Sequence, residues 1–188
     1  HTAGSACGKK IGDAPSTTMG QEKRFNYAFQ TASKDAFIDK VMAGMPTPPA
    51  YYPVLKKGNK VGATLVSELP APASLTPDQV ADAVQNGALL VDTRRQEAFP
   101  ERHIPGAIFA GLGTNFTAWM GWIAPYEQDL ILVLEDEGAL EEAITELRRI
   151  GLDRVSGYLA GGLAAWQAAG RDVTSLPLMT VTELSARL

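Results

Sequence analysis

Residues 130–159 read LILVLEDEGALEEAITELRRIGLDRVSGYL and contain a strand pattern, a helix pattern and a second strand pattern in succession. Leu130–Leu134 is an apolar run with the length of a buried strand, and Val155–Leu159 is a second one. Between them, apolar residues recur at helical spacing from Gly138 to Arg149, with acidic residues early and two arginines in the last turn. That charge order suits the helix dipole, and Gly151 is the residue type that commonly ends a helix. The stretch therefore predicts one strand–helix–strand unit.

The same alternation continues on both sides of this stretch. Thr76, Pro77 and Gln79 predict the start of a helix that ends at residues 86–87, because they form a capping box with proline at the first helical position. Short strands are predicted at 88–91, closed by Asp92, and at 107–110, and a further helix at 162–169. Strands separated by helices are typical of parallel sheets with right-handed crossovers. We therefore predict an α/β domain over residues 73–172, with a central parallel sheet of four or five strands and helices on both faces.

The composition is that of an ordinary globular protein. Apolar residues make up 45% of the 188 residues, the net charge is −4 and the pI is near 5.2, which argues against a nucleic-acid surface. No apolar run has the length of about 18 residues that a membrane span needs, and no signal-peptide pattern is present. The single cysteine, Cys7, excludes an internal disulfide and favours a reducing compartment, so we expect a cytoplasmic protein.

Two other zones flank the predicted α/β domain. Residues 45–73 contain six prolines, which predict extended or looped chain because proline lacks an N–H donor and fixes φ: Pro46, Pro48, Pro49, Pro53, Pro70 and Pro72. The chain begins at His1 without a methionine, and residues 177–184 look like the opening of a further domain. We therefore expect an internal piece of a longer protein, with residues 173–188 as a linker and the start of another domain.

Three short motifs occur in order between residues 91 and 166. Residues 91–94 (VDTR) end a predicted strand with Asp-x-Arg, Phe99 and residues 102–108 (RHIPGAI) follow, and residues 159–162 (LAGG) precede Trp166. Together they resemble the rhodanese family, with its GHIPGA segment, in which Arg102 here replaces glycine, and its closing GG-x-x-x-W pattern. The resemblance implies a rhodanese-like fold, with a central parallel sheet flanked by helices.

The motif residues have structural interpretations that need no catalysis. Asp92 and Arg94 stand at a strand end, where an ion pair or a turn hydrogen bond would fix the loop. His103 is interpreted as a hydrogen-bonding core histidine rather than a base. The glycines and the proline are interpreted as turn residues, and the tryptophan as a packing residue one helical turn later. We expect structural roles for all eight: Asp92, Arg94, His103, Pro105, Gly106, Gly161, Gly162 and Trp166.

Rhodanese chemistry needs a cysteine that carries sulfur as a persulfide, in a loop whose backbone N–H groups and following helix N-terminus face the thiolate. In this sequence that position falls at Leu134 or Glu135, so the resemblance implies a domain with no catalytic residue. Phosphatases of related fold need the same cysteine and are excluded as well. The remnant of the anion-binding loop carries three carboxylates and lacks the family's arginine: Glu135, Asp136, Glu137, Gly138, Ala139 and Leu140.

Residues 1 to about 70 resemble the end of a metallo-β-lactamase (αβ/βα) domain, of the persulfide dioxygenase type that is fused to rhodanese domains. The residues that carry this resemblance are HTAGSACGK at 1–9, PSTT at 15–18, EKRFN at 22–26 and the stretch 37–59. In this interpretation Phe25–Phe29 is a helix candidate and residues 1–72 are the C-terminal portion of the metallo-β-lactamase-like domain. His1 would stand at the second metal position. The alternative is that His1 is a histidine at the start of the chain with no role in metal binding. Cys7 is interpreted as a small buried residue.

The resemblance implies three functional hypotheses. In the first, the parent protein is an iron-dependent persulfide dioxygenase that oxidises a thiol persulfide to sulfite, and this rhodanese-like domain is a non-catalytic spacer or docking module. In the second, the domain is a binding module for a protein or an anion. In the third, the parent is a metallo-hydrolase of the glyoxalase II type that acts on thioesters.

The expected cofactors and partners follow from the first hypothesis. We expect no cofactor in this chain alone, with iron or zinc in the part of the parent that would precede His1. The expected partners are a small-molecule thiol persulfide and neighbouring domains of the same polypeptide, with no nucleic acid and no membrane; a homo-oligomer is compatible with the sequence.

Overall fold

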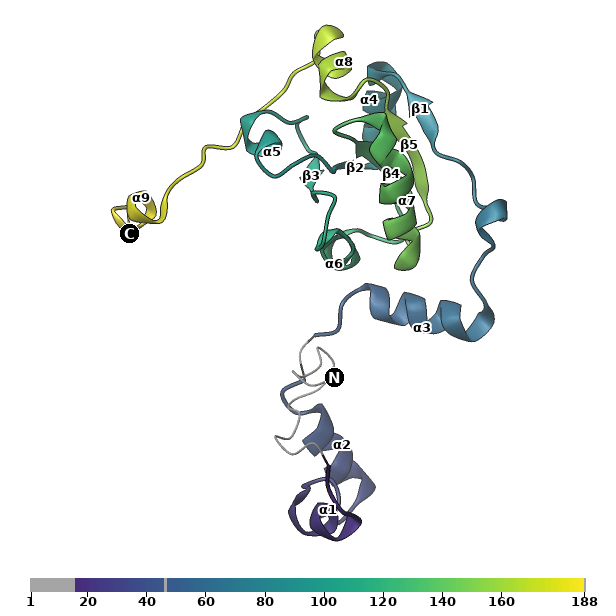
Figure 1. Cartoon of the computed structure of the whole chain (residues 1–188), viewed down its shortest axis with the longest axis vertical. Helices are drawn as coiled ribbons and strands as arrows, with labels where there is room; N and C mark the ends of the chain where they lie inside the picture. Colours follow the sequence, from purple (N-terminus) through teal and green to yellow (C-terminus); the bar gives the residue numbers. More distant parts are fainter. Residues whose placement is uncertain (1–15, 46, 188) are drawn as a thin grey trace. The chain divides into compact units, whose positions relative to one another are not determined.

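The computed structural model describes residues 16–45 and 47–187. The chain divides into two compact units, His1–Pro48 and Pro49–Leu188, which are described separately (Figure 1). The candidate metal position His1 and the cysteine Cys7 lie outside the described residues. Among the described helices, none is long and apolar enough to cross a membrane.

The described part of the first unit contains two short helices, α1 (Met19–Phe25) and α2 (Lys34–Met42). No side chain of either helix is buried. The prediction of a helix at Phe25–Phe29 is wrong, since α1 ends at Phe25 and a turn follows. The physical reason lies in Asn26, whose side-chain oxygen accepts a hydrogen bond from the N–H of Ala28 at 3.0 Å and thereby stabilises a turn in place of further helix.

The proline-rich segment contains helix α3 (Tyr51–Val61), so the prediction of extended or looped chain is wrong for these residues. Pro53 is the third residue of the helix, where a backbone N–H has no acceptor within the helix, and proline is therefore tolerated. Gly62 ends the helix with φ +97°, and a short 3₁₀ helix, η1 (Val66–Glu68), follows. The ring of Tyr51 packs against the hydrophobic core of the second unit, next to Gly121.

The second unit is built on a five-stranded sheet with the order β1-β5-β4-β2-β3, in which every neighbouring pair is parallel (Figure 1). This confirms the predicted α/β fold with a central parallel sheet. Its elements are β1 (Ala73–Leu75), α4 (Pro77–Gln85), β2 (Leu89–Asp92), α5 (Ala98–Glu101), β3 (Ile108–Phe109), α6 (Phe116–Ile123), β4 (Leu130–Val133), η2 (Glu137–Ala139), α7 (Leu140–Arg149), β5 (Val155–Leu159), α8 (Gly162–Ala168) and α9 (Val181–Ser185).

Side chains of the central strands alternate between two apolar clusters, one on each face of the sheet. Leu130 and Leu132 of β4 pack with residues of α6 and α7, whereas Ile131 and Val133 pack with residues of α4 and α8. All four residues of β4 are fully buried. A strand covered by helices on both faces reads as a continuous apolar run, which is the pattern that marked β4 in the sequence.

Local signals place α4 and α7 close to their predicted positions. The capping box of Thr76 and Gln79 is present at the start of α4, and Gly151, with φ +75°, follows the end of α7. After α8 the chain returns toward α5, where Thr174 and His103 exchange backbone hydrogen bonds of 2.8 and 2.9 Å. A second capping box, formed by Thr180 and Glu183, opens α9.

Candidate functional site

The candidate site lies at the carboxyl ends of β2 and β4, which are neighbours in the sheet. The chain continues from β2 to β3 on one side and from β4 to β5 on the other, so the order of the strands reverses between them. Ligands of open parallel sheets bind in the crevice at such a point. Residues 93–97 follow β2 there, and the acidic loop, which we define as Glu135–Leu140, follows β4.

Glu135 links the two loops across this point. Its Oε2 accepts a hydrogen bond from the backbone N–H of Arg95 at 3.3 Å, and its Oε1 lies 3.4 Å from Nη2 of the same residue. The backbone hydrogen bond from Arg95, followed by its side-chain hydrogen bond and the charge of its guanidinium, holds the pKa of the Glu135 carboxyl below its usual range. Glu135 therefore stays ionised near neutral pH.

The two following carboxylates also accept backbone N–H groups. Oδ1 of Asp136 accepts from Gly138 at 2.8 Å, and Oε1 of Glu137 accepts from Gly161 at 3.1 Å. The hydroxyl of Tyr158 lies 3.5 Å from Oε2 of Glu137. An anion-binding loop depends on free backbone donors, and here the N–H of Gly138 within the loop and those of Arg95 and Gly161 beside it are bonded to carboxylates of the chain itself.

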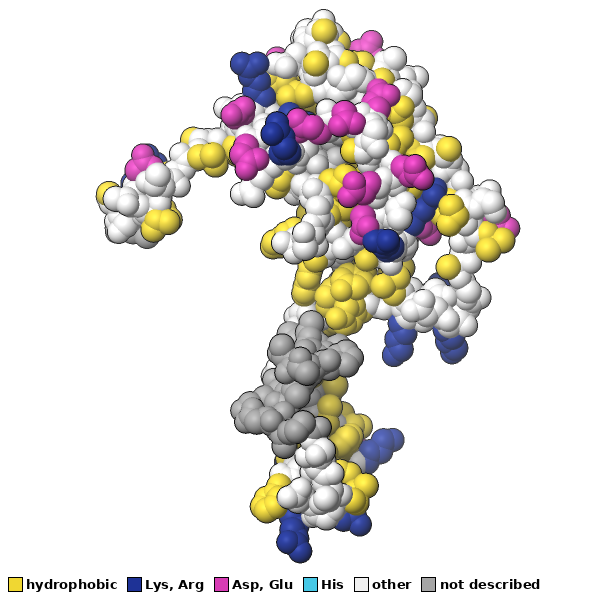
Figure 2. Space-filling model, viewed as in Figure 1, with side chains coloured by type: hydrophobic (Ala, Val, Ile, Leu, Met, Phe, Trp, Pro, Cys, Tyr) yellow, Lys and Arg dark blue, Asp and Glu magenta, His cyan; other side chains and the backbone are white. Residues whose placement is uncertain are grey.

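A small cavity of about 240 Å³ lies over the acidic loop. It is lined by Leu134, Glu135, Asp136, Glu137, Leu159, Gly161 and Gly162. None of these lining residues has a thiol, hydroxyl or amine that would act as a nucleophile. Figure 2 shows acidic side chains gathered on the near face of the domain, over α7 and the loop before it. An approaching thiosulfate or phosphate would be repelled by the carboxylates at this cavity.

A buried ion pair fixes the loop that follows β2. Nη2 of Arg94 lies 2.7 Å from Oδ2 of Asp92, and Nε of Arg94 donates to both oxygens of this carboxylate. Asp92 is fully buried and Arg94 is 9% exposed. Nη2 of Arg94 also donates to the carbonyl oxygen of Arg102 at 2.7 Å, so the pair ties β2 to the segment after α5.

The sequence profile of the rhodanese-like domain family matches residues 76–169, which is half of the chain. The chain belongs to the rhodanese-like domain family. Comparison of the sequence with curated proteins found no match.

Two solved structures add to this assignment. A metallo-β-lactamase from Staphylococcus aureus subsp. aureus COL is 34% identical in sequence over 85% of this chain, with a TM-score of 0.54. The match covers 43% of that protein, so this chain spans less than half of its length. The Alr3790 protein from Anabaena sp. is 21% identical over 61% of this chain and all of its own, with a TM-score of 0.50, and supports the rhodanese-like fold.

In this rhodanese-like domain His103 lies away from the acidic loop. Its ring stacks on Phe99 with a centroid distance of 3.9 Å, and its Nδ1 lies 2.8 Å from the carbonyl oxygen of Phe99. The residue is 6% exposed and is not among the residues that line the cavity over the acidic loop. The structure therefore does not bring His103 together with Glu135.

The glycine pair of the rhodanese-like domain approaches the acidic loop closely. Gly161 and Gly162 have φ values of +67° and +57°, and a Cβ at Gly162 would lie 3.3 Å from the carbonyl oxygen of Leu134. Trp166 lies beyond them, 7% exposed, and its Nε1 donates to the carbonyl oxygen of Asp172 at 2.8 Å. The glycines thus border the acidic loop. The tryptophan packs with residues of α4, on the face of the sheet opposite to α6 and α7.

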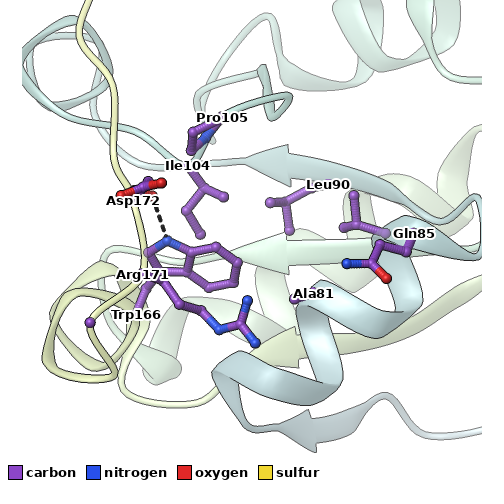
Figure 3. Close-up of a pocket in the computed structure, with 10 residues that line it drawn as sticks. Ala81, Gln85, Leu90, Ile104, Pro105, Trp166, Arg171 and Asp172 are labelled. Carbon is purple, nitrogen blue, oxygen red and sulfur yellow. Dashed lines mark hydrogen bonds between the residues drawn. The ribbon is translucent and has the colours of Figure 1, made fainter.

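Trp166 forms part of a second cavity, of about 350 Å³ (Figure 3). Pro105 also lines it, next to Gly106, whose φ is +82°. Arg171 lies against the indole, with its guanidinium carbon 5.1 Å from the ring centroid, and its Nη2 pairs with Asp78 at 2.7 Å. The guanidinium of Arg171 and the indole N–H of Trp166 are therefore already engaged.

Arg95 and Tyr158 both approach the acidic loop, although no motif in the sequence marks them. Arg95 directly follows the Asp-x-Arg motif, but its pairing with Glu135 joins residues that are 40 positions apart. A pairing over that separation leaves no periodic signal in one sequence. The family's arginine is missing from the loop itself, and Arg95 supplies a cation from the neighbouring loop instead.

The described residues offer no metal centre. In residues 16–45 and 47–187, no three His, Cys, Asp or Glu side chains are grouped so that they could hold a metal ion. The only metal position suggested by the sequence is His1, which lies outside this part of the chain. The described residues therefore do not fit an iron or zinc site of their own.

Proposed function

We propose that this chain belongs to a metallo-β-lactamase–rhodanese fusion protein of sulfur metabolism. The match to the Staphylococcus aureus metallo-β-lactamase supports this, because it covers 85% of the chain. The rhodanese-like segment is half of the chain, so a match of that extent includes most of this segment. A protein named as a metallo-β-lactamase thus carries a region similar to this rhodanese-like domain.

Within that fusion, the rhodanese-like domain is a non-catalytic spacer or docking module. The observation that carries this proposal is the acidic loop, where Glu135, Asp136 and Glu137 each accept a backbone N–H. A carboxylate or an aliphatic side chain cannot hold a transferable sulfane sulfur, so the loop has no route to sulfur transfer.

The reaction of the parent is the oxidation of a small thiol persulfide. It would consume the persulfide, dioxygen and water, and would release the thiol, sulfite and two protons. Iron, bound by the part of the parent that precedes His1, would supply the binding and activation of dioxygen. The support for this reaction is the resemblance of residues 1–70 to the tail of persulfide dioxygenases, and this chain alone would not perform it.

The test uses the full-length parent loaded with iron. Glutathione persulfide is added, and oxygen uptake and sulfite release are measured together. We expect both to occur with equal stoichiometry. A parallel assay supplies S-lactoylglutathione, a thioester, and measures its hydrolysis.

Thioester hydrolysis without persulfide oxidation would overturn the dioxygenase proposal and favour the glyoxalase II type. A second form of the parent, with Glu135→Gln, Asp136→Asn and Glu137→Gln together, should oxidise persulfide at an unchanged rate. A large loss of rate in this form, with its fold intact, would contradict the non-catalytic role of the acidic loop.

A further inference from the structure

A third cavity of the rhodanese-like domain, of about 330 Å³, shares no lining residue with the cavity over the acidic loop. It lies where β2 and β3 end, and Arg94, Arg95, Phe109, Thr114, Asn115 and Trp119 are among its lining residues. Its volume is in the lower range of small-molecule sites. Its lining residues thus include two arginines, two aromatic residues and residues with short polar side chains.

The two arginines have unused donors. The side chain of Arg95 is 75% exposed, and only its Nη2 meets a side-chain acceptor, Glu135 at 3.4 Å. The guanidinium of Arg94 is held on Asp92 and Arg102 through Nε and Nη2, and its Nη1 has no acceptor among the described residues. No fully buried side-chain nitrogen of the described residues lacks a partner, so this unpaired Nη1 is open to solvent. The guanidinium of Arg94 is therefore held in place with one donor unused, and the neighbouring side chain of Arg95 is exposed.

The opposite part of the cavity is aromatic. Trp119 is 60% exposed and Phe109 is half-buried, so ring surface remains available to a ligand. The hydroxyl of Thr114 and the amide of Asn115 form no hydrogen bond with any described residue. By contrast, the cavity beside Trp166 has its arginine paired with Asp78 and its indole N–H bonded to Asp172.

We propose that this cavity binds a small organic anion. Its carboxylate, sulfonate or phosphate accepts hydrogen bonds from Arg95 and from Nη1 of Arg94, and its planar body lies against Trp119. Charge-assisted hydrogen bonds to arginine and contact with an aromatic face are each favourable interactions for such a ligand. Glu135 competes with the ligand for Arg95, so the acidic loop weakens binding. The proposal does not depend on the reaction of the parent protein.

The experiment is a titration of the 188-residue chain with naphthalene-2-sulfonate, followed by ¹H–¹⁵N NMR. The chain has three tryptophans, Trp119, Trp122 and Trp166, so the indole N–H region contains three signals that report on three places. We expect saturable shifts of the Trp119 indole signal and of the backbone amides of residues 111–115. The neutral naphthalene-2-sulfonamide should bind at least about tenfold more weakly, because it lacks the charge.

Variants distinguish this site from general attraction to aromatic surface. Arg95→Met should weaken binding about tenfold, and Glu135→Gln should strengthen it several-fold, because it releases Arg95. Two matched controls should leave the affinity unchanged. Arg171→Met removes an arginine from the cavity beside Trp166, and Trp122→Leu removes an exposed tryptophan of α6 that does not line the proposed site.

Three results would overturn the proposal. The first is the absence of saturable shifts, and the second is an affinity that is the same in Arg95→Met as in the unchanged chain. The third is a pattern in which Trp122 shifts as much as Trp119, which indicates adsorption to exposed rings. Glu135→Gln keeps the test decisive if Arg95→Met fails to fold, because the proposal requires it to bind more tightly.

Discussion

Asp92 and Arg94 form an ion pair beneath the loop that follows β2, with Asp92 fully buried. Asp92→Asn removes the negative charge and leaves the guanidinium of Arg94 buried without compensation. We expect the free energy of unfolding to fall by about 3 kcal/mol, because breaking one partner of a buried pair leaves a desolvated charge. Urea denaturation, followed by circular dichroism, measures the change.

The control for this variant is Asp78→Asn, which removes an ion pair with Arg171 in which the Asp78 side chain is 82% exposed. An exposed pair contributes at most about 1 kcal/mol, so the control should unfold nearly like the unchanged chain. Equal effects of the two variants would show that burial does not set the strength of the Asp92–Arg94 pair.

Tyr126 makes the free energy of unfolding of the domain depend on pH in the alkaline range. Its hydroxyl donates to the carbonyl oxygen of Ile150 at 2.7 Å, and burial, with a further contribution from Tyr51, raises the pKa of Tyr126 to about 12. In the unfolded chain the pKa of tyrosine is about 10, so the unfolded chain loses this proton first as the pH rises. The contribution of the Tyr126 hydroxyl to the free energy of unfolding is therefore present below about pH 10 and is lost between about pH 10 and 12.

Tyr126→Phe tests this dependence by unfolding at a series of pH values. At neutral pH the free energy of unfolding of the variant should be lower by about 1 kcal/mol, which is the typical contribution of one hydrogen bond. Above pH 10 the difference between the variant and the unchanged chain should shrink, because the ionised tyrosine no longer contributes. A difference that stays constant up to pH 12 would contradict the assignment.

At the scale of elements, β5 depends on a glycine where it meets β1. Gly157 pairs with Ala73, and a Cβ at Gly157 would lie 2.6 Å from Cδ1 of Leu75 and 2.8 Å from the carbonyl oxygen of Ala73. Gly157→Ala should therefore lower the free energy of unfolding by about 1–3 kcal/mol, because the added methyl group must push away the side chain of Leu75 and the backbone of Ala73.

A second glycine provides the matched control. Gly58 lies within α3, and a Cβ there would have no neighbour within 4 Å. Gly58→Ala should stabilise the helix by about 0.5–1 kcal/mol, because alanine loses less conformational entropy than glycine. A loss of stability from Gly58→Ala equal to that from Gly157→Ala would show that the close approach to β1 is not the cause.

The sequence predicts those elements that carry a strong local signal. Strand β4 was marked by an unbroken apolar run, and α4 by its capping box. Helix α6 was not predicted, because its sequence, FTAWMGWI, is apolar on nearly every side and shows no period. The proline content of residues 45–73 predicts loop where α3 forms, because Pro53 stands in the first turn of the helix, where a proline is tolerated.

The candidate site was predictable only in part. The absence of a cysteine at Leu134 and Glu135 can be read from the sequence, because the strand before them and the motifs on either side limit the position to these two residues. The hydrogen bonds of Glu135 to Arg95 and of Glu137 to Gly161 join loops that meet only when the sheet forms. The unused donors of Arg94 and Arg95 depend on the same tertiary contacts.

At the scale of the whole molecule, the described part of the first unit has no buried side chain in its helices, whereas the second unit has two apolar clusters. The large apolar side chains described in the first unit are exposed rather than packed in a core: Phe25, Tyr27, Phe29, Phe37 and Ile38 are 79%, 47%, 54%, 40% and 43% exposed. A segment with few buried apolar contacts opens at little cost in free energy, so proteases reach it readily.

Limited digestion with chymotrypsin, followed by mass spectrometry, tests this difference. Cleavage should occur first within residues 16–48, at the exposed aromatic residues, and should leave a stable product that contains β1 to α8. Survival of residues 16–48 for as long as the sheet would contradict the account, because it would require a core that the described residues do not contain.

The central claim is that this rhodanese-like domain does not transfer sulfur, because carboxylates fill the loop where a cysteine would stand. The 188-residue chain is incubated with thiosulfate and cyanide, and thiocyanate release is compared with that of an active rhodanese. We predict a rate equal to that of buffer alone, and no gain of a sulfur atom by the protein in its mass spectrum. Thiocyanate release that rises with the concentration of the chain and survives Cys7→Ser would contradict the account.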